Sequence, residues 1–456
     1  MDVSTAQGKV AAEASGTVEP LLAQLRQVVI TLTNEVLAQK HAGLLRQIAR
    51  RKAKSDRVLF FGRPGFSDNA KYLYLHAAAQ PRGEIGFTPV WCTPNVKLAA
   101  ELKSRGLEAF VLGQDANQTL RLLLSAAAAV FCTNPREALG QPLYAHALEG
   151  SFRLQLWHGV GTKKIDLMLL EQQNLLNLDA MESLHAVTIV DAVLSPSARY
   201  DRVWREAFGA DRMVRAGLPR NEVLLRPATE LERIGAYTLP PGDGQPRILF
   251  APTFTYAGEK PVWAAREILD SLREGLPGGR GQIFVKPHPF DKVQGVAPQS
   301  GDGIHMIPSD ADVYPALPSF DLLVTDKSSL LTDFLLTDKP VVVIKGRRAD
   351  AGEDTSDENP FAGLEPGLAT DLDGLSAAVK QALTRDTMQA NRARLRGRIF
   401  ATDPAAACSS LTRMLSAVVT NRMERQKESF TFLPSVLAPE PNTAAQVSAG
   451  TPEATR

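Results

Sequence analysis

Residues 322–334 read LLVTDKSSLLTDF, and this stretch indicates the fold more clearly than any other part of the chain. Residues 321–324, of which 322–324 are apolar, are typical of a short buried strand, and from Ser328 onward the apolar residues recur at helical spacing. At the turn between them, the unpaired N–H groups of a helix start and the serine hydroxyls favour an anion such as phosphate. The alternative is that Ser328 or Ser329 only caps the helix.

The same alternation of strand and helix runs through most of the chain. Apolar runs typical of strands recur at 58–61, 88–92, 109–112, 130–132, 152–157, 187–194, 247–252, 282–286 and 341–345. Segments at helical spacing lie between them, among them 69–79, 96–105, 313–317 and 329–336. Such alternation indicates parallel βαβ units, so we expect an α/β fold with two doubly wound, Rossmann-like domains that face each other across a cleft.

Composition divides the chain into six parts. We predict a disordered N-terminus at 1–20, an amphipathic helix at 21–54, a Rossmann-like domain at 55–226, a linker rich in proline and glycine at 227–246, a second Rossmann-like domain with C-terminal helices at 247–425, and a disordered tail at 426–456. The length of 456 residues also favours two domains, because one hydrophobic core rarely serves so long a chain.

Charge and cysteine usage exclude several classes of protein. The 51 basic and 50 acidic residues give a net charge of +1, without the basic excess of a dedicated nucleic-acid binder. The three cysteines are too widely spaced for a disulfide framework or a CxxC metal site, which favours the reducing cytoplasm. No signal peptide and no apolar run long enough to cross a bilayer are recognisable. The helix at 21–54 either packs on the first domain or lies on an anionic membrane surface.

The first of two notable histidines, His158, directly follows a predicted strand, where ligands of open α/β sheets bind. It lies in WHGVGTKK at 157–164. Gly159 lets the backbone approach a ligand there, and Lys163 and Lys164 bring positive charge. The alternative is a loop histidine that is held by backbone hydrogen bonds.

The second histidine, His288, lies in KPHP at 286–289, again at the end of a predicted strand. Prolines on both sides fix its backbone, so the imidazole is directed to one place. It could hold a phosphate oxygen, and Lys286 could add charge. The alternative is a rigid turn in which the histidine is incidental.

Other polar residues join these motifs at strand ends. Arg220, in GLPRN at 217–221, is either a phosphate clamp or part of a structural salt bridge. Thr253 supplies a hydroxyl after the first strand of the second domain. Asp333 lies four residues past Ser329, so we expect it to order the serine turn from behind. No Walker loop, HExxH, GxSxG or clear GxGxxG is present, and metal-ligand spacing is absent.

Taken together, these motifs resemble those of the CDP-glycerol glycerophosphotransferases, which include the teichoic-acid and capsule-type polymerases and primases. In chain order, the resemblance rests on WHG at 157–159 with the two lysines, GLPRN at 217–221, APT at 251–253, KPHP at 286–289 and TDKSS at 325–329 with Asp333. Single motifs of this kind are unspecific, but the set in this order is specific.

The resemblance implies a GT-B-like fold in which the domain at 55–226 handles the acceptor and the domain at 247–425 handles the CDP-alditol donor. It implies transfer of glycerol phosphate from CDP-glycerol to a hydroxyl group of a cell-surface polymer or lipid-linked glycan, with release of CMP. Such a protein works in the cytoplasm, with a peripheral position at the inner face of the cytoplasmic membrane left open. No nucleic-acid partner is expected.

The resemblance also assigns roles to residues. His158 matches the family's WHG histidine and is expected to be the general base, since the ordinary pKa of histidine suits that role. His288 matches the histidine expected at the diphosphate. Ser328 and Ser329 match the serines that hold the phosphates. The remaining donor-binding residues are expected to be Thr325, Asp326, Lys286, Thr253, Arg220, Lys163, Lys164 and Gly159.

The sequence departs from the family pattern at two positions. Lys327 stands where a tyrosine is usual, and Glu222 stands where aspartate is common. Because of Lys327, CDP-ribitol stays open as the donor. A separate alternative is a GT-B glycosyltransferase that uses a nucleotide sugar. A third alternative is a non-catalytic binding relative. We expect no cofactor and no dedicated metal site, and leave open whether Mg²⁺ assists the reaction.

Overall fold

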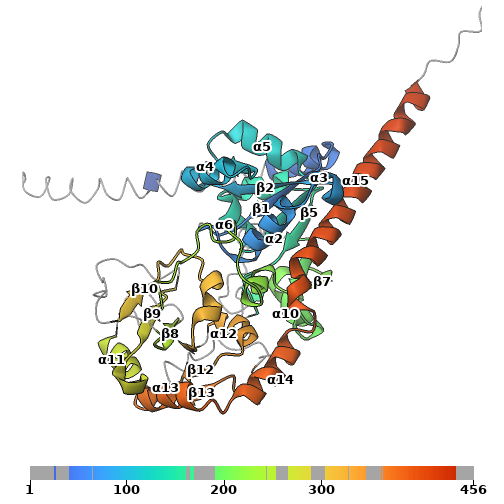
Figure 1. Cartoon of the computed structure of the whole chain (residues 1–456). Helices are drawn as coiled ribbons and strands as arrows, with labels where there is room; N and C mark the ends of the chain where they lie inside the picture. The colour runs from blue at the N-terminus through green and yellow to red at the C-terminus, as the bar shows by residue number, and fades with distance from the viewer. Residues whose placement is uncertain are drawn as a thin grey trace, which may run out of the picture.

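The computed structural model of the chain describes residues 25–26, 41–63, 65–160, 165–168, 190–242, 244–252, 265–288, 303–326, 328–345, 361 and 363–437. Their strands form two separate parallel sheets, which lie in the upper and lower lobes of Figure 1. The prediction for residues 1–20 and most of the prediction for the helix at 21–54 lie outside the described residues.

The first sheet has seven parallel strands in the order β3-β2-β1-β4-β5-β6-β7. They are β1 (Arg57–Phe61), β2 (Thr88–Thr93), β3 (Ala109–Val111), β4 (Ala128–Phe131), β5 (Phe152–Gln155), β6 (Ala192–Ser195) and β7 (Met213–Arg215). Its helices are α2 (Asp68–Ala78), α3 (Arg82–Ile85), α4 (Val96–Ser104), α5 (Ala116–Ser125), α6 (Pro135–Leu139), α7 (Pro142–Ala147) and α10 (Asp201–Phe208), with the 3-10 helices η1 (Ala198–Tyr200) and η2 (Pro219–Leu224). Strand addition reverses direction after β3, as in doubly wound folds.

The second sheet has six parallel strands in the order β10-β9-β8-β11-β12-β13, which repeats the same topology. They are β8 (Arg247–Phe250), β9 (Gln282–Val285), β10 (Ile304–Met306), β11 (Leu322–Thr325), β12 (Val341–Ile344) and β13 (Leu368–Thr370). Its helices are α11 (Arg266–Gly275), α12 (Leu330–Phe334), α13 (Leu375–Thr384) and α14 (Gln389–Ile399), with η4 (Pro277–Gly279), η5 (Tyr314–Ser319) and η6 (Leu335–Thr337). The predicted α/β fold of two doubly wound units is thus confirmed.

Alternation along the central strands builds the core on both faces of each sheet. In β1, Val58 and Phe60 join one apolar cluster, whereas Leu59 and Phe61 join the cluster on the other face. This is the period of two expected of a strand that is covered by helices on both sides. The first cluster also contains Leu249 and Phe334 from the second half of the chain, so one continuous apolar core joins the two lobes.

The structure corrects the predicted helix at 313–317. The segment is instead the 3-10 helix η5, because Pro315 lies at its start and Pro318 lies inside it. Likewise, the helix predicted at 329–336 is the α-helix α12 of five residues followed by the 3-10 turn η6.

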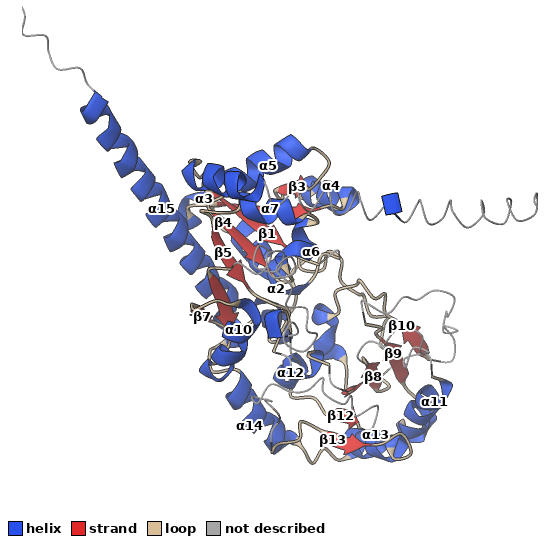
Figure 2. Ribbon diagram, turned by 180° about the vertical axis from the view of Figure 1, so that it is seen from behind, coloured by secondary structure: helices blue, strands red, loops and turns tan. Residues whose placement is uncertain are grey.

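The last helix, α15 (Ala407–Leu437), follows the short helix η7 (Pro404–Ala406). Figure 1 shows α15 in red, running from α14 beside the lower lobe up along the upper lobe, where it packs against α2 and α3; the view from behind in Figure 2 agrees. The prediction that residues 426–456 are disordered is therefore wrong for 426–437. The stretch after Met423 contains ERQKE, whose residues are good helix formers, and the apolar face before it anchors the helix.

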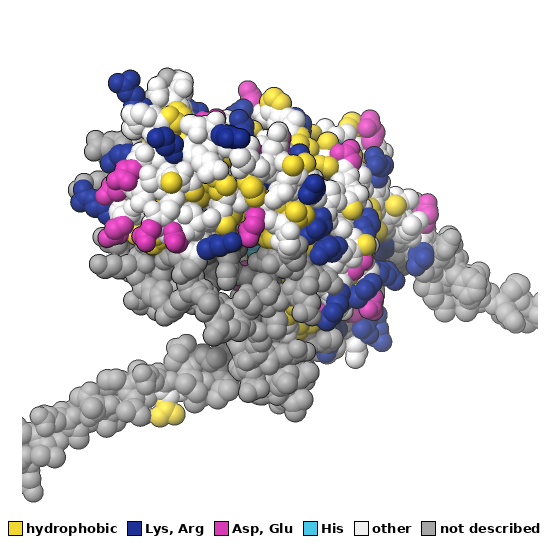
Figure 3. All heavy atoms as spheres, turned by 90° about the horizontal axis from the view of Figure 1, so that it is seen from below, with side chains coloured by type: hydrophobic (Ala, Val, Ile, Leu, Met, Phe, Trp, Pro, Cys, Tyr) yellow, Lys and Arg dark blue, Asp and Glu magenta, His cyan; other side chains and the backbone are white. Residues whose placement is uncertain are grey.

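The surface seen from below carries basic, acidic and apolar side chains interspersed (Figure 3), as the net charge of +1 leads one to expect. Among the described helices, none combines the length and the apolar character needed to cross a membrane.

Candidate active site

The loops that follow β5 and β11 meet where the two lobes touch. Both strands are parallel members of their sheets, and both loops leave from carboxyl ends, where α/β folds bind ligands. The Thr332 hydroxyl, from the lower lobe, donates to the Val160 carbonyl oxygen of the upper lobe at 3.2 Å. This contact brings the predicted WHG motif next to the predicted serine turn.

The backbone around His158 is held in an unusual shape by polar contacts. Trp157 has a φ angle of +52°, and its carbonyl oxygen accepts a hydrogen bond from Asn69 Nδ2 at 2.8 Å. Its N–H donates to Gln155 Oε1 at 3.0 Å. The rings of Trp157 and His158 lie 4.1 Å apart, so the imidazole is supported on one face. A strained, over-determined backbone of this kind is characteristic of functional sites.

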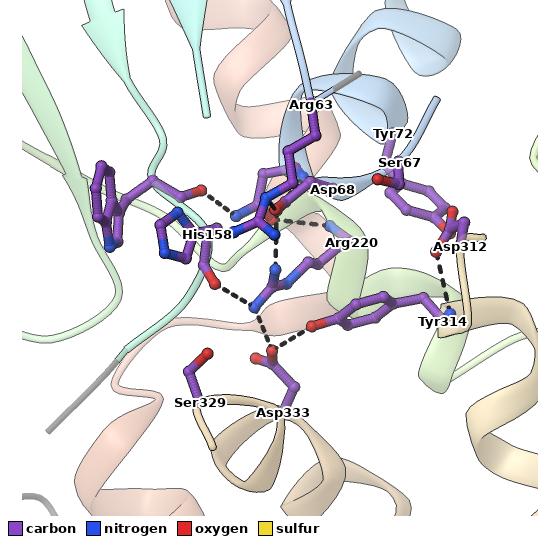
Figure 4. Close-up of polar contacts among 12 residues, drawn as sticks. Arg63, Ser67, Asp68, Tyr72, His158, Arg220, Asp312, Tyr314, Ser329 and Asp333 are labelled. Atoms are coloured by element: carbon purple, nitrogen blue, oxygen red, sulfur yellow. Dashed lines mark hydrogen bonds and ion pairs between the residues drawn. The ribbon is translucent and has the colours of Figure 1, made fainter. Parts of the chain in front are cut away.

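Arg220 is the centre of the polar network in Figure 4. Its Nη1 donates to Asp68 Oδ1 at 2.8 Å, and its Nη2 donates to both the His158 carbonyl oxygen at 2.7 Å and Asp333 Oδ2 at 2.5 Å. Burial alone would lower the pKa of Arg220, but the Asp333 carboxylate, Tyr314 and Asp68 raise it above its ordinary value. Arg220 is only 4% exposed. Two carboxylates thus pair with Arg220, as in the predicted salt bridge, and its Nε has no hydrogen-bond partner among the described residues.

Asp333 is fully buried and joins the two lobes. Besides Arg220, the Tyr314 hydroxyl donates to its Oδ2 at 2.7 Å. The Tyr314 ring also lies under the Arg220 guanidinium, with 4.6 Å between the guanidinium carbon and the ring centroid. Asp333 was expected to support the serine turn from behind, and it instead fixes Arg220 and through it the His158 backbone.

Gly159 is required by this packing. Its φ angle is +115°, and a Cβ atom there would lie 2.4 Å from Arg220 Nη2. The glycine that was expected to let a ligand approach thus also lets the arginine approach.

The serine turn is less regular than predicted. Ser329 is the N-cap of α12 but makes no capping hydrogen bond, whereas Ser328 Oγ accepts from the Leu330 N–H at 3.3 Å. Both serines are half-buried, and Figure 4 shows Ser329 on the same side of Arg220 as His158. Because α12 has only five residues, a helix dipole contributes little, and the hydroxyls are the main donors.

Thr325 does not lie open to a ligand. It is fully buried at the end of β11, and its hydroxyl donates to the Ala251 carbonyl oxygen at 2.6 Å. This hydrogen bond ties β11 to the end of β8. Asp326, the next residue, is half-buried. Lys163, Lys164, Thr253 and Lys327 lie outside the described residues.

The two histidines lie close enough to influence each other. Burial lowers the pKa of His158 well below its ordinary value, and the positive charges of Arg63, Arg220 and His288 lower it further, against a hydrogen bond with the Cys132 backbone. His158 Nδ1 has no hydrogen-bond partner among the described residues. The imidazole is therefore neutral at neutral pH, and its Nδ1 is free to accept a hydrogen bond from a ligand.

Lys286 lies in the same region, at the end of β9. Its Nζ donates to the Ser309 carbonyl oxygen at 2.7 Å. Burial lowers the pKa of Lys286 to about 8, and the nearby charge of Arg63 contributes to this shift. The ammonium is thus crowded by another cation, an arrangement that an anionic ligand would relieve.

Sequence reasoning missed Arg63 and Asp68. Arg63 follows β1, and its Nε lies 3.3 Å from Asp68 Oδ2. Arg63 contributes to the pKa shifts of both His158 and Lys286, so it lies between the WHG and KPHP motifs. Asp68 has a φ angle of +75° at the start of α2. The sequence pattern that could have indicated this loop as part of the site is the pair of glycines at 62 and 65, which flank the loop after β1.

The described residues bring together one set of potential metal ligands, which the sequence spacing did not reveal. Ligand atoms of His76, Glu222 and Cys408 lie within 4.8 Å of one another. Burial and Glu222 raise the pKa of the Cys408 thiol well above its ordinary value, and the Cys408 N–H donates to Glu222 Oε1 at 2.7 Å. Because the Cys408 thiol is protonated and the Glu222 carboxylate already accepts a hydrogen bond, we interpret the cluster as a structural contact between η2 and α15 rather than as a metal site.

Comparison with known proteins gives three findings. The model of a family described as CDP-glycerol:poly(glycerophosphate) glycerophosphotransferase matches residues 44–350, more than half of the chain. A teichoic acid glycerol-phosphate primase of Bacillus spizizenii is 25% identical over 196 residues, which are 41% of this chain and 49% of the primase. The chain thus spans about half the length of this curated relative in the match.

Solved structures of the wall teichoic acid polymerase TagF are similar in fold. One has a TM-score of 0.63 at 19% identity and covers 88% of this chain and 99% of the TagF chain. A histidine variant of TagF that was soaked with CDPG gives the same values. The two-lobed, GT-B-like architecture expected from the sequence is therefore confirmed.

Proposed function

Because the chain belongs to the CDP-glycerol:poly(glycerophosphate) glycerophosphotransferase family, we propose that it transfers glycerol phosphate from CDP-glycerol to a hydroxyl group of a teichoic-acid-like polymer. The observation that carries the proposal is the juxtaposition of His158, from the upper lobe, with His288, from the lower lobe, each at a strand's carboxyl end. A general base and a phosphate ligand are needed on opposite sides of the reacting phosphorus, and two facing lobes supply them.

His158 acts as the base in this proposal. Its lowered pKa keeps the imidazole neutral near pH 7, so one ring nitrogen can take the proton of the acceptor hydroxyl. The acceptor oxygen then forms a bond to the β-phosphorus of CDP-glycerol, and the bond from that phosphorus to the bridging oxygen breaks. CMP leaves with the electron pair of the broken bond.

The donor diphosphate is held from the lower lobe. His288 and Lys286 follow β9, and the hydroxyls of Ser328 and Ser329 follow β11, the strand two positions away in the same sheet. Arg63 adds a cation from the upper lobe. Phosphoryl transfer requires chiefly alignment and charge stabilisation from the protein, which these donors supply together.

CMP release tests the proposal. We expect CMP from CDP-glycerol in the presence of a poly(glycerol phosphate) acceptor, with CDP-ribitol and a panel of nucleotide sugars as comparison donors. His158→Ala and His288→Ala should each lower the rate at least about a hundredfold, as for other general acid–base and charge-stabilising groups. His41→Ala is the matched control, since His41 is exposed and lies outside the site. Turnover of nucleotide sugars alone would refute the assignment.

We also propose a peripheral position on the inner face of the cytoplasmic membrane. Leu44 and Ile48 are 58% and 44% exposed and lie one turn apart on the helical residues 41–51, whereas Ala42 and Ala49 face the core. An exposed apolar pair beside basic residues is the pattern of a helix that lies at a bilayer surface. Binding of Leu44→Ser/Ile48→Ser to anionic vesicles should be weaker than that of the unchanged protein.

A further inference from the structure

A basic pocket of about 510 Å³ lies on the upper lobe. Six cationic side chains line it and no carboxylate does: Arg50, Lys52, Lys54, Arg212, Arg422 and Arg425. They come from three parts of the chain, namely the end of the helical residues 41–51 with the segment that follows it, the residue before β7, and helix α15. A chain with a net charge of +1 thus concentrates six cations around one concavity.

The pocket is separate from the candidate active site. Phe152, which lines it, begins β5, and Arg212 directly precedes β7, so the pocket lies at the amino ends of these parallel strands. His158 follows the carboxyl end of β5. Four strand residues, at roughly 3.3 Å each, separate the two edges of the sheet by about 13 Å. The pocket and the candidate active site therefore lie at opposite edges of the same sheet.

The charges of the pocket are only partly neutralised. Arg50 Nε donates to Glu149 Oε1 at 3.0 Å, and Glu149 also pairs with Arg153 outside the pocket. Within the described part of the chain, no carboxylate pairs with Lys52 or Arg212. Both side chains are exposed, and no acidic side chain of the described residues holds either of them away from the pocket.

Lys54 is fixed in place by hydrogen bonds to the backbone. Lys54 is 7% exposed, and its Nζ donates to the carbonyl oxygens of Leu124 at 2.8 Å and Glu149 at 3.1 Å. In the orientation that satisfies its hydrogen bonds, the Gln426 amide pairs with the backbone N–H and carbonyl of Lys54 at 3.0 and 3.2 Å. Helix α15 is thereby tied to the segment that carries Lys52 and Lys54.

The cations also repel one another. Burial and the neighbouring Arg422 lower the pKa of Lys54 to about 8. Burial lowers the pKa of Arg422 as well, with Arg153 and Arg425 adding to the effect and Asp191 opposing it. Such crowding of like charges is unfavourable in the free protein and is relieved when an anion binds between them.

We propose that this pocket binds a phosphate group, either of a soluble phosphate ester or of a phospholipid headgroup. Guanidinium and ammonium groups that converge from several directions suit a tetrahedral oxyanion, because each supplies charge-assisted hydrogen bonds to a different oxygen. The exposed Leu44 and Ile48 belong to the helical segment whose end lines the pocket, so a lipid can present its headgroup there.

The test compares two double variants of equal charge. Lys52→Glu/Arg212→Glu reverses the two unpaired cations of the pocket, whereas Lys97→Glu/Lys380→Glu reverses two exposed lysines on α4 and α13. Binding of inorganic phosphate and of sn-glycerol 3-phosphate is measured by calorimetry without CDP-glycerol. Co-sedimentation is measured with vesicles of phosphatidylglycerol and of phosphatidylcholine.

We expect the pocket variant to bind its phosphate ligand at least about tenfold more weakly than the control variant, the effect of losing hydrogen bonds to a charged group. If the pocket variant binds the soluble probes more weakly, the pocket is a site for free phosphate esters. If it binds only the anionic vesicles more weakly, the pocket is a site for a phospholipid headgroup. Equal binding by the two variants in every arm would overturn the inference. Since no arm involves CMP release, failure of the proposed function leaves this result unaffected.

Discussion

Gly159 combines a left-handed backbone with a contact that leaves no room for a side chain. Its φ angle is +115°, and the position of a Cβ atom falls 2.4 Å from Arg220 Nη2. Arg220 cannot move away without releasing the His158 carbonyl or Asp333. The WHG motif can therefore keep this geometry only if the residue at position 159 has no side chain.

Gly159→Ala should lower the free energy of unfolding by about 3 kcal/mol, the sum of backbone strain and a lost charge-assisted hydrogen bond. It should also reduce kcat at least about tenfold, because the His158 loop must shift. Urea unfolding and CMP release measure the two effects. Gly113→Ala is the control, since Gly113 has a φ angle of +76° but open space around it, and should cost about 1 kcal/mol. Equal losses in both variants would contradict the role of the contact.

The pH dependence of kcat/KM should report His158 and Lys286. The base must be neutral to take a proton. Because the pKa of His158 is lowered from its ordinary value of 6.5, activity should fall on the acid side only at pH values below 6.5. Lys286 must be charged to hold phosphate, and its pKa is about 8, so activity should also fall as the pH rises through 8. Lys286→Arg should abolish the alkaline limb, because the guanidinium stays charged above pH 12.

Lys54→Arg provides the control for this profile. The pKa of Lys54 is also lowered to about 8, but Lys54 lies in the basic pocket rather than at the site. Its substitution should leave both limbs in place. An alkaline limb that persists in Lys286→Arg would show that Lys286 does not hold the donor.

At the scale of elements, the buried link between η2 and α12 is the contact on which the site depends. Arg220 belongs to η2 and Asp333 to α12, and both are almost completely buried. A buried carboxylate that loses its charge leaves the opposing guanidinium without its partner, which is costly in a low-dielectric interior.

Asp333→Asn should accordingly lower the free energy of unfolding by about 3 kcal/mol. Asp338→Asn is the matched control five residues later. Asp338 is 38% exposed where it pairs with Arg396, and it has a φ angle of +57°, which asparagine tolerates. The control should cost less than about 1 kcal/mol, as exposed ion pairs do. Chemical denaturation followed by fluorescence measures both, and similar costs would argue against a special role for the buried pair.

The same elements show what the sequence could and could not predict. Strand positions such as 152–155 and 322–325 were predictable, because apolar runs that end in polar or glycine-rich turns are a local signal. The histidines after β5 and β9 were identified for the same reason. The partners of Arg220 were not predictable, since Asp68 and Asp333 lie 152 and 113 residues away in the chain. Contacts between residues so far apart in the chain do not produce a periodic pattern of apolar residues in the sequence.

At the scale of the whole molecule, Lys71 connects the two lobes. It is fully buried on α2, and its Nζ donates to Asp312 Oδ2 and to the carbonyl oxygen of Glu232, both at 2.7 Å, and to that of Ile234 at 2.9 Å. The Tyr72 hydroxyl also donates to Asp312 Oδ2, at 2.7 Å. One ammonium group thus binds the lower lobe and the segment that joins the lobes.

Lys71→Met should lower the free energy of unfolding by about 3 to 5 kcal/mol, because Asp312 keeps its charge but loses its counter-ion. It should also loosen the contact between the lobes, so the radius of gyration from small-angle X-ray scattering should rise. Lys339→Met is the control, since Lys339 is 41% exposed where it lies 3.9 Å from Asp321. An unchanged radius of gyration in Lys71→Met would show that other contacts keep the lobes together.

The chain passes between the lobes twice, once between β7 and β8 and once between α14 and α15. The two passages touch, because a Cβ atom on Gly217 would lie 2.8 Å from Pro404 Cα. They therefore tether the two lobes at one place, so that neither lobe can drift away from the other. The effective concentration of each lobe at the other is therefore high, so contacts between the lobes that are broken can form again without a diffusive search.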